Sequence, residues 1–267
     1  MNALDPPVDS PSTTSEPASL SDMVDLLVQT GSLLLQHGAD AGRVESSLQQ
    51  MAPGLGIDRI DAIVMSKTIL LTATRRDVHH TRVARVPIVG VNMNSLNEVE
   101  QLLGLFRQGR ATPEQMAAIL DRIAALPHHY PRGMTVAAVG LACAAFCRLF
   151  GGDWAAVAVT GGAAAVAAWV RMELNRRQVN YFLVVLITGL VASLLAGNAL
   201  WFSQTPQSAL TAAVLLLVPG VPLINASVDI LRGHISAGLA RATASLVVFL
   251  GIALGLGFAL RLFQVRL

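Results

Sequence analysis

The sequence predicts an α+β N-terminal domain, placed in the cytoplasm, followed by an all-α polytopic membrane domain of five transmembrane helices. Charge separates the two halves: residues 1–133 hold 11 Lys and Arg against 14 Asp and Glu, whereas residues 134–267 hold 8 against 3. Composition agrees, since 53% of the residues are hydrophobic and 13% are charged. We therefore expect a disordered tail over 1–20, the α+β domain over 21–127 and the membrane domain over 128–267.

The tail is rich in Pro, Ser and Thr, carries three acids and no base, and lacks the apolar run of a signal peptide. Ser21-Asp22 is then a candidate helix cap. In the α+β domain, spacing and turn residues predict two helices first: one from Met23 to His37-Gly38, and one that is capped by Asp40 and ends at Pro53-Gly54. Three strands are predicted next, over 60–65, 68–74 and 81–86. Two further helices follow: one is capped by Ser95 and runs through Gly109, and the other is opened by Thr112-Pro113-Glu114 and runs through Leu126.

Five apolar segments are long enough to be transmembrane spans. Residues 133–150 and 154–170 supply two, and 242–260 supply the last. The 48 residues 181–228 contain no charged residue or histidine and hold two more, joined by the polar segment 198–208. If the spans alternate, six arginines lie on the side of the N-terminal domain and three on the other, so the positive-inside rule places this domain in the cytoplasm.

The fourth span contains a proline-rich break that is a candidate substrate or ion pathway. Pro219 and Pro222 flank Gly220, and two prolines deep in a span free backbone carbonyls from their helical partners. Secondary transporters use such broken helices to bind ionic substrates, and Asn225 is expected to line the same polar cavity. The alternative is a kink that only shapes helix packing.

Four charged or titratable residues follow the break: Asp229, Arg232, His234 and Arg241. Asp229 and Arg232 are three residues apart and could pair on an interfacial helix face. Asp229 could instead carry a proton or gate the pathway, and His234, five residues later, belongs to a residue type that often acts as a proton carrier. Arg171, Arg176 and Arg177 are best explained as topology signals.

Other chemistry finds little support in the sequence. Cys143 and Cys147 share a helix face without an acid or histidine nearby, so they are expected to be packing residues and no metal site is predicted. The chain shows no nucleotide-binding fingerprint, nucleophile elbow or zinc-protease motif, so neither an enzyme nor a cofactor is expected. Nucleic-acid binding is disfavoured because the basic residues lie beside membrane segments.

Several motifs together resemble those of the threonine/serine exporter family. They are Leu35-Gln36-His37-Gly38-Ala39-Asp40, Arg43-Val44-Glu45, Gly90-Val91-Asn92-Met93, Gly151-Gly152-x-Trp154, the block from Leu217 to Ala226, Gly233-His234 and Gly238-Leu239-Ala240-Arg241. The resemblance covers about residues 20–260. Within the family, the chain is similar to the separately encoded larger subunit of a two-component bacterial succinate exporter.

The resemblance implies export of a small carboxylate-bearing solute across the bacterial inner membrane, driven by the proton gradient. Succinate or a related dicarboxylate is expected, with threonine and serine as the alternative substrates. Long members of the family carry a second membrane half, so a separate smaller membrane subunit of opposite orientation is expected as the partner. A membrane-anchored ligand sensor is a further alternative, and deletion of the soluble domain distinguishes it, because a sensor has no flux to lose.

Overall fold

The computed structural model describes residues 19–87, 90–125 and 130–263. By their contacts, the described residues form two compact units. The N-terminal unit takes its residues from Met1–Pro127 and Val221–Ala242, and the membrane unit takes its residues from His128–Gly220 and Thr243–Leu267. Residues 221–242, which the sequence placed in the membrane domain, are thus counted with the N-terminal unit.

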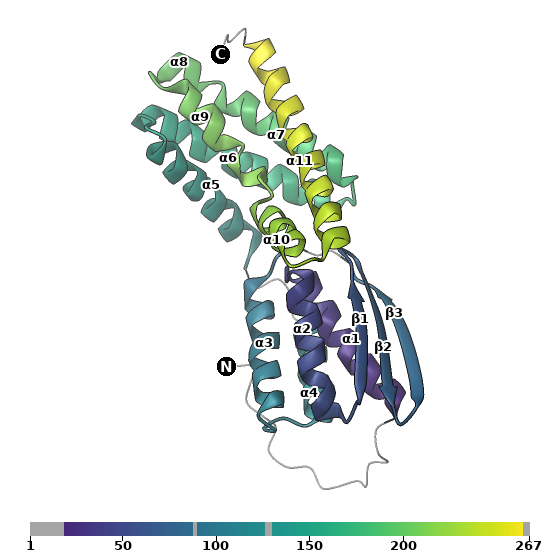
Figure 1. The fold of residues 1–267 in the computed structure, drawn as a ribbon. Coiled ribbons are helices and arrows are strands. Elements are labelled where there is room, and N and C mark those ends of the chain that lie inside the picture. The colour runs from purple at the N-terminus through teal and green to yellow at the C-terminus, as the bar shows by residue number, and fades with distance from the viewer. Residues whose placement is uncertain (1–18, 88–89, 126–129, 264–267) are drawn as a thin grey trace. The chain divides into compact units, whose positions relative to one another are not determined.

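The N-terminal unit has the expected α+β composition. Figure 1 shows its elements in chain order: α1 (Leu20–Gln36), α2 (Ala41–Met51), the 3₁₀ turn η1 (Ala52–Leu55), β1 (Arg59–Val64), β2 (Thr68–Arg75), β3 (Val78–Arg85), α3 (Met93–Arg107), α4 (Pro113–Ala125), nearly all of α10 (Gly220–Leu231) and the start of α11 (Ile235–Leu262).

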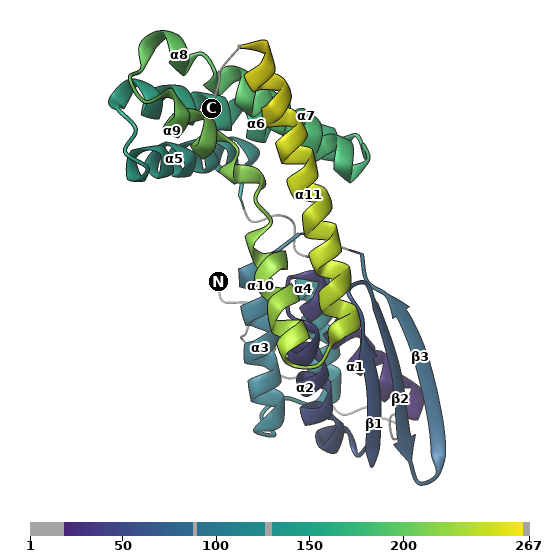
Figure 2. The ribbon, with the colours of Figure 1, turned by 45° about the horizontal axis from the view of Figure 1, so that its top comes forward.

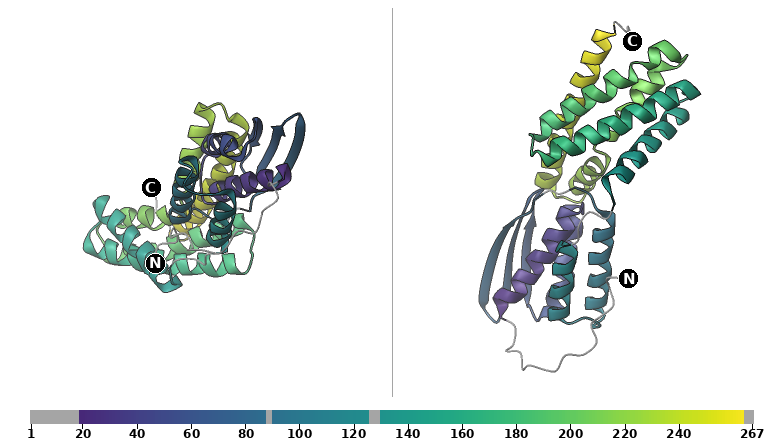
Figure 3. Two further views of the ribbon diagram at one scale, coloured as in Figure 1. Left: turned by 90° about the horizontal axis from the view of Figure 1, so that it is seen from below. Right: turned by 180° about the vertical axis from the view of Figure 1, so that it is seen from behind.

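The sheet is an antiparallel meander in the order β1-β2-β3. Alternation along β2 puts Ile69, Leu71 and Ala73 on one face, where all three are fully buried. Helices α1 and α2 cover this face and α3 and α4 pack on the helices, as the two views of Figure 3 show. The unit therefore has a sheet layer and two helical layers.

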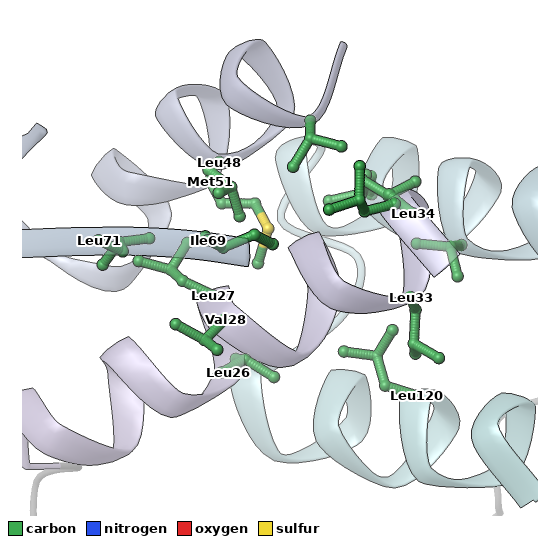
Figure 4. Packing of buried hydrophobic residues seen from close by; sticks show 14 of the residues in the cluster. Leu26, Leu27, Val28, Leu33, Leu34, Leu48, Met51, Ile69, Leu71 and Leu120 are labelled. Atoms are coloured by element: carbon green, nitrogen blue, oxygen red, sulfur yellow. The ribbon is translucent and has the colours of Figure 1, made fainter. Parts of the chain in front are cut away.

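Large aliphatic side chains fill the core of the N-terminal unit. Leu27 and Leu34 of α1, Leu48 and Met51 of α2, and Leu120 of α4 have no exposed surface and belong to one buried cluster with Ile69 and Leu71 of β2. In Figure 4, Leu27, Leu48 and Met51 are drawn near the β2 side chains, and Leu34 and Leu120 lie farther from the strand. Each such side chain contributes about 1.5–3 kcal/mol to folding when it leaves water.

Two expected helix caps are wrong, and both true caps lie earlier in the chain. Ser19 caps α1 in a capping box with Asp22, because a residue at the third helical position can return a bond to the cap. Asn92 caps α3, while Ser95 lies in its first turn and bonds Asn92. Asp40 caps α2 as expected, through the backbone N–H of Arg43.

Strand β3 begins three residues before the expected start at Thr81. The β2–β3 turn takes only Arg76 and Asp77, with φ of 45° and 65°. These positive angles suit a tight two-residue hairpin, whose twist matches that of the strands. No Gly or Asn marks the turn in the sequence, which is why alternation alone placed the strand too late.

The membrane unit is entirely helical where it is described. Its elements are α5 (Arg132–Leu149), α6 (Trp154–Arg176), α7 (Tyr181–Ala196), α8 (Ala199–Phe202), α9 (Pro206–Ala213), η2 (Leu215–Leu217) and the rest of α11. Among the described residues, four helices are long and apolar enough to cross a membrane, and the total is five if the pair 206–217 and 220–231 is one broken span. The expected count of five is the upper of these two values.

Small side chains dominate the contacts inside the membrane unit. A Cβ on Gly140 of α5 would lie 2.8 Å from the carbonyl oxygen of Gly161 on α6, so the two backbones approach closely. Ala163, Ala167, Ala192 and Ala196 belong to a buried cluster of this unit that also contains larger side chains such as Leu210. Cys143 and Cys147 are buried free thiols, as expected of packing residues.

The proline-rich break exists but is shorter than expected. Only Val218 and Pro219 are outside helical structure, and Gly220, Val221 and Pro222 form the first turn of α10. Pro222 is tolerated there because the first-turn N–H groups have no helical partner to lose. The freed carbonyl of Leu216 accepts a 2.9 Å hydrogen bond from Nη1 of Arg171, so a side chain expected only to set topology stabilises the break.

Candidate functional site: a polar clamp on the first helical turn

Helix α10 and the start of α11 form a hairpin within the N-terminal unit, visible side by side in Figure 2. The turn between them is Arg232-Gly233-His234. Gly233 adopts φ of +87°, a region that side chains with a Cβ disfavour, so glycine permits the tight reversal. The hairpin brings Asp229 and Arg241, twelve residues apart, into contact.

Three side chains of the hairpin bind backbone groups of the turn between α1 and α2. Nδ2 of Asn225 donates to the carbonyl of Gly38 at 2.7 Å, and Nη2 of Arg241 donates to the carbonyl of Ala39 at 3.1 Å. Oδ1 of Asp229 accepts from the N–H of Ala41 at 2.7 Å. We call Asn225, Asp229, Arg232, His234 and Arg241, with the residues 37–45 that they contact, the clamp.

The Asp229–Arg241 ion pair is the centre of the clamp. Nη1 of Arg241 lies 2.5 Å from Oδ2 of Asp229, and the two side chains are 11% and 0% exposed. The carboxylate also lies at the first N–H of α2, where the helix dipole favours negative charge. A buried pair of this kind costs several kcal/mol when one partner is removed, because the other charge stays buried.

Two further ion pairs form the more exposed rim of the clamp. Nη1 of Arg232 lies 3.0 Å from Oδ1 of Asp40, and Nδ1 of His234 lies 3.6 Å from Oε2 of Glu45. A Cβ on Gly42 would meet Nε2 of His234 at 3.1 Å, so this glycine lets the hairpin turn approach α2. The Arg232 side chain is 56% exposed, and such pairs contribute about 0–1 kcal/mol.

His37 lies at the base of the clamped turn. Its side chain is buried, and among the described residues its Nδ1 has no hydrogen-bond partner. Burial lowers the pKa of the imidazole below its usual value, because the charged form loses hydration. His37 is therefore neutral at physiological pH in the folded chain.

The structure brings together five of the eight residues proposed for the pathway. Asn225, Asp229, Arg232, His234 and Arg241 meet in the clamp, and Pro222 lies in the first turn of α10. Pro219 and Gly220 belong with the membrane unit. The alternative pairing of Asp229 with Arg232 on one helix face is wrong, because Asp229 pairs with Arg241 of α11 and Arg232 pairs with Asp40.

Sequence reasoning missed the opposite side of the clamp. Asp40 was expected only as a helix cap, and Glu45 and the backbone of Gly38, Ala39 and Ala41 were given no role. One signal was available: the motifs from Leu35 to Asp40 and from Arg43 to Glu45 are part of the family resemblance. Their partners, 187 to 202 residues later along the chain, could not be identified from spacing.

Within residues 19–87, 90–125 and 130–263, no group of three or more His, Cys, Asp or Glu side chains could hold a metal ion. His79 and His80 lie in β3, and His128 and His129 are outside the described residues. The membrane unit has its own carboxylate network, in which Asp153 caps α6 through Ala156 and also accepts from Ser203 and the N–H of Gln204.

Comparison with known proteins decides the family. The model of the ThrE family, described as "Putative threonine/serine exporter", matches residues 25–263. The chain belongs to this family. The match includes both sides of the clamp and every candidate span, and the predicted resemblance is confirmed.

Curated relatives differ in length. The chain is 34% identical over 244 residues to a Klebsiella aerogenes protein named "Probable succinate transporter subunit YjjP", which covers 90% of this chain and 94% of that protein. An Escherichia coli K12 protein of the same name is 33% identical with the same coverage. A Mycobacterium tuberculosis "Probable threonine/serine exporter" is 23% identical over 90% of this chain but only 46% of its own length. No solved structure matched the chain.

Proposed function

We propose that this member of the ThrE family is one subunit of a secondary transporter that exports succinate or a related dicarboxylate across the bacterial inner membrane. The observation that carries the proposal is the match to the Klebsiella aerogenes protein named "Probable succinate transporter subunit YjjP", 94% of which is covered. Four or five candidate spans are consistent with a transporter. The N-terminal unit is proposed to lie in the cytoplasm, following the distribution of arginines.

The proposed partner is a separate smaller membrane subunit. The support is the name "subunit" of the relatives and the length of the Mycobacterium tuberculosis relative, of which this chain covers 46%. The break in the fourth span adds no separate support, because Arg171 already satisfies the carbonyl of Leu216 that the break frees. The proposal of a partner therefore rests on the comparisons. Its opposite orientation rests on the count of five spans, because an odd number places the two ends of this chain on opposite sides of the membrane, so a second membrane half that followed it would begin on the other side.

The clamp is proposed to take part in transport. Its buried charges connect α10, which begins directly after the break at Val218 and Pro219, with the α1–α2 turn. A charge that is paired inside a transporter is a common means of coupling to a proton or substrate. Asp229 is the proposed coupling residue. The proposed role of Pro219, Gly220 and Pro222 is to separate α10 from the helical segment that precedes it.

Efflux from proteoliposomes tests the proposal. Vesicles loaded with labelled succinate, malate, threonine or serine are prepared with this chain, with a candidate partner, and with both. We expect succinate efflux only from vesicles that contain both proteins, and an increase with an inward proton gradient. Efflux of threonine and serine without dicarboxylate efflux would instead support the alternative of a threonine/serine exporter subunit, which the Mycobacterium tuberculosis relative favours. Full efflux from this chain alone would refute the need for a partner.

A further inference from the structure

Helices α2 and α3 of the N-terminal unit, which lie side by side in Figure 1, are linked by two pairs of side chains. Nε of Arg43 on α2 lies 2.5 Å from Oε1 of Glu100 on α3, and Nη1 of Arg107 on α3 donates a hydrogen bond to Oε1 of Gln50 on α2. On each helix the two linking residues are seven positions apart. Because seven residues make almost two helical turns, both links lie on the same side of each helix, about 10 Å apart along the axes.

Two hollows on the surface of the unit meet at the second link, and Gln50 and Arg107 line both of them. The smaller hollow has a volume of about 320 Å³ and extends to Glu100 of the first link. The larger has a volume of about 500 Å³, and beyond the link it is lined by Pro53, Gly54 and Phe106. These volumes are in the range of small-molecule sites in proteins. A small molecule in either hollow therefore lies against the Arg107–Gln50 link.

The two links differ in charge. Glu100 offers Arg43 a carboxylate, whereas Gln50 offers Arg107 only a neutral amide oxygen. Among the described residues, Arg107 has no other hydrogen bond and no carboxylate partner. The bond to Gln50 holds the guanidinium between the two hollows, and the planar fork of arginine suits a carboxylate, which it can bind through two parallel hydrogen bonds. The link thus has the donors for a carboxylate but none of its own.

We propose that the Arg107–Gln50 link binds the carboxylate of a small solute, which pairs with the guanidinium of Arg107 and accepts a hydrogen bond from the amide nitrogen of Gln50. The apolar part of the solute lies against Pro53 and Phe106 in the larger hollow. Both linking side chains are exposed, so water competes for them and we expect a Kd in the millimolar range. The site lies outside the clamp, and the inference does not rest on the proposed function.

Equilibrium dialysis of the purified full-length chain in detergent tests the site with labelled succinate. We expect unlabelled propionate, which has one carboxylate, to compete with it, and neutral succinamide not to compete. Gln50→Glu should weaken binding at least about tenfold, because the new carboxylate pairs with Arg107 as Glu100 pairs with Arg43. Arg107→Gln should weaken it as much by removing the guanidinium. The same dialysis with labelled threonine distinguishes an amino acid from a dicarboxylate as the source of the bound group, and binding of either supports the site.

Gln49→Glu and Arg110→Gln are the matched controls. They make the same changes of charge at exposed residues on α2 and just after α3, and neither residue lines a hollow. Both should leave the Kd within about twofold of that of the wild type. All four substituted side chains are exposed, so the variants are expected to fold, and similar Tm values check this. Equal weakening by a groove variant and its control would refute the site.

The number of bound solutes separates this site from any other in the chain. Succinate bound elsewhere remains in every variant, so Gln50→Glu and Arg107→Gln should each reduce the number bound per chain by one at a concentration that nearly saturates the wild type. An unchanged number, or no binding by the wild type, would refute the site. These measurements need neither partner nor transport. Binding at the link without efflux by the reconstituted pair would therefore refute only the proposed function, and efflux without this binding would refute only the site.

Discussion

The two units of this chain are stabilised in different ways. The N-terminal unit buries Leu, Ile, Val and Met around a sheet and connects distant segments through buried charges. The membrane unit places alanines in its buried cluster and glycines where helix backbones approach closely, and Asp153 caps one of its helices. The difference follows from the solvent, because water favours the burial of large apolar side chains and lipid does not. Helices in lipid are therefore stabilised by the close approach of their backbones at small residues.

The largest expected effect is on the buried charges of the N-terminal unit. Asp229→Ala should lower the free energy of unfolding by about 3–5 kcal/mol, since Arg241 and the N–H of Ala41 lose the carboxylate that they bind. Chemical denaturation in detergent without added carboxylate measures it. Arg232→Ala is the matched control at the exposed rim of the same clamp, with an expected loss of about 0–1 kcal/mol. Equal losses for both variants would contradict the central role of the buried pair.

The second prediction concerns the aliphatic core. Leu48→Ala should cost about 2–5 kcal/mol, because Leu48 has no exposed surface and packs in the largest cluster of the unit. The same denaturation curves measure the loss. Leu141 of α5, which is 72% exposed within the chain, is the comparison position in the membrane unit. Leu141→Ala should cost much less, and a larger cost than for Leu48→Ala would remove the contrast between the units.

The third prediction concerns small residues in the membrane unit. Gly140→Ala should destabilise the chain by about 1–3 kcal/mol, since its Cβ would lie 2.8 Å from the carbonyl oxygen of Gly161. Gly162→Ala has open space around the new Cβ and should stabilise α6 by about 0.5–1 kcal/mol. Thermal unfolding of both variants checks the sign, and two changes of the same sign would contradict the packing.

The smallest expected effect is a pH dependence of the N-terminal unit. Burial lowers the pKa of His37 in the folded chain below its usual 6.5, so its contribution to stability is full above pH 6.5 and is lost as the pH falls through the folded pKa. His37→Gln should therefore flatten the decrease of stability between neutral and mildly acidic pH. Unfolding midpoints at several pH values give the slopes. A slope unchanged by the substitution would assign the pH dependence to other groups.

Local features were predictable because neighbouring residues determine them. Asp40 caps α2 and Pro113 opens α4, as the sequence indicated. The apolar lengths give four candidate spans among the described residues, and the predicted five if the bent pair is one span. The predicted caps of α1 and α3 and the predicted start of β3 lay two or three residues too late in the sequence. For the caps, the reason is that several polar residues near a helix start can cap it and only the folded backbone selects one. Family membership, too, was readable from motifs alone.

The clamp was decided by the tertiary structure. Sequence spacing favoured pairing of Asp229 with Arg232, but α10 turns Asp229 toward the N-terminus of α2 and toward Arg241 instead. The sequence determined that these charges lie beside a broken apolar segment. It could not determine their partners, because a buried charge is stabilised by whichever groups the fold brings within about 3 Å. The N–H of Ala41 that donates to Asp229 lies 188 residues away along the chain, and the carbonyl of Ala39 that accepts from Arg241 lies 202 residues away.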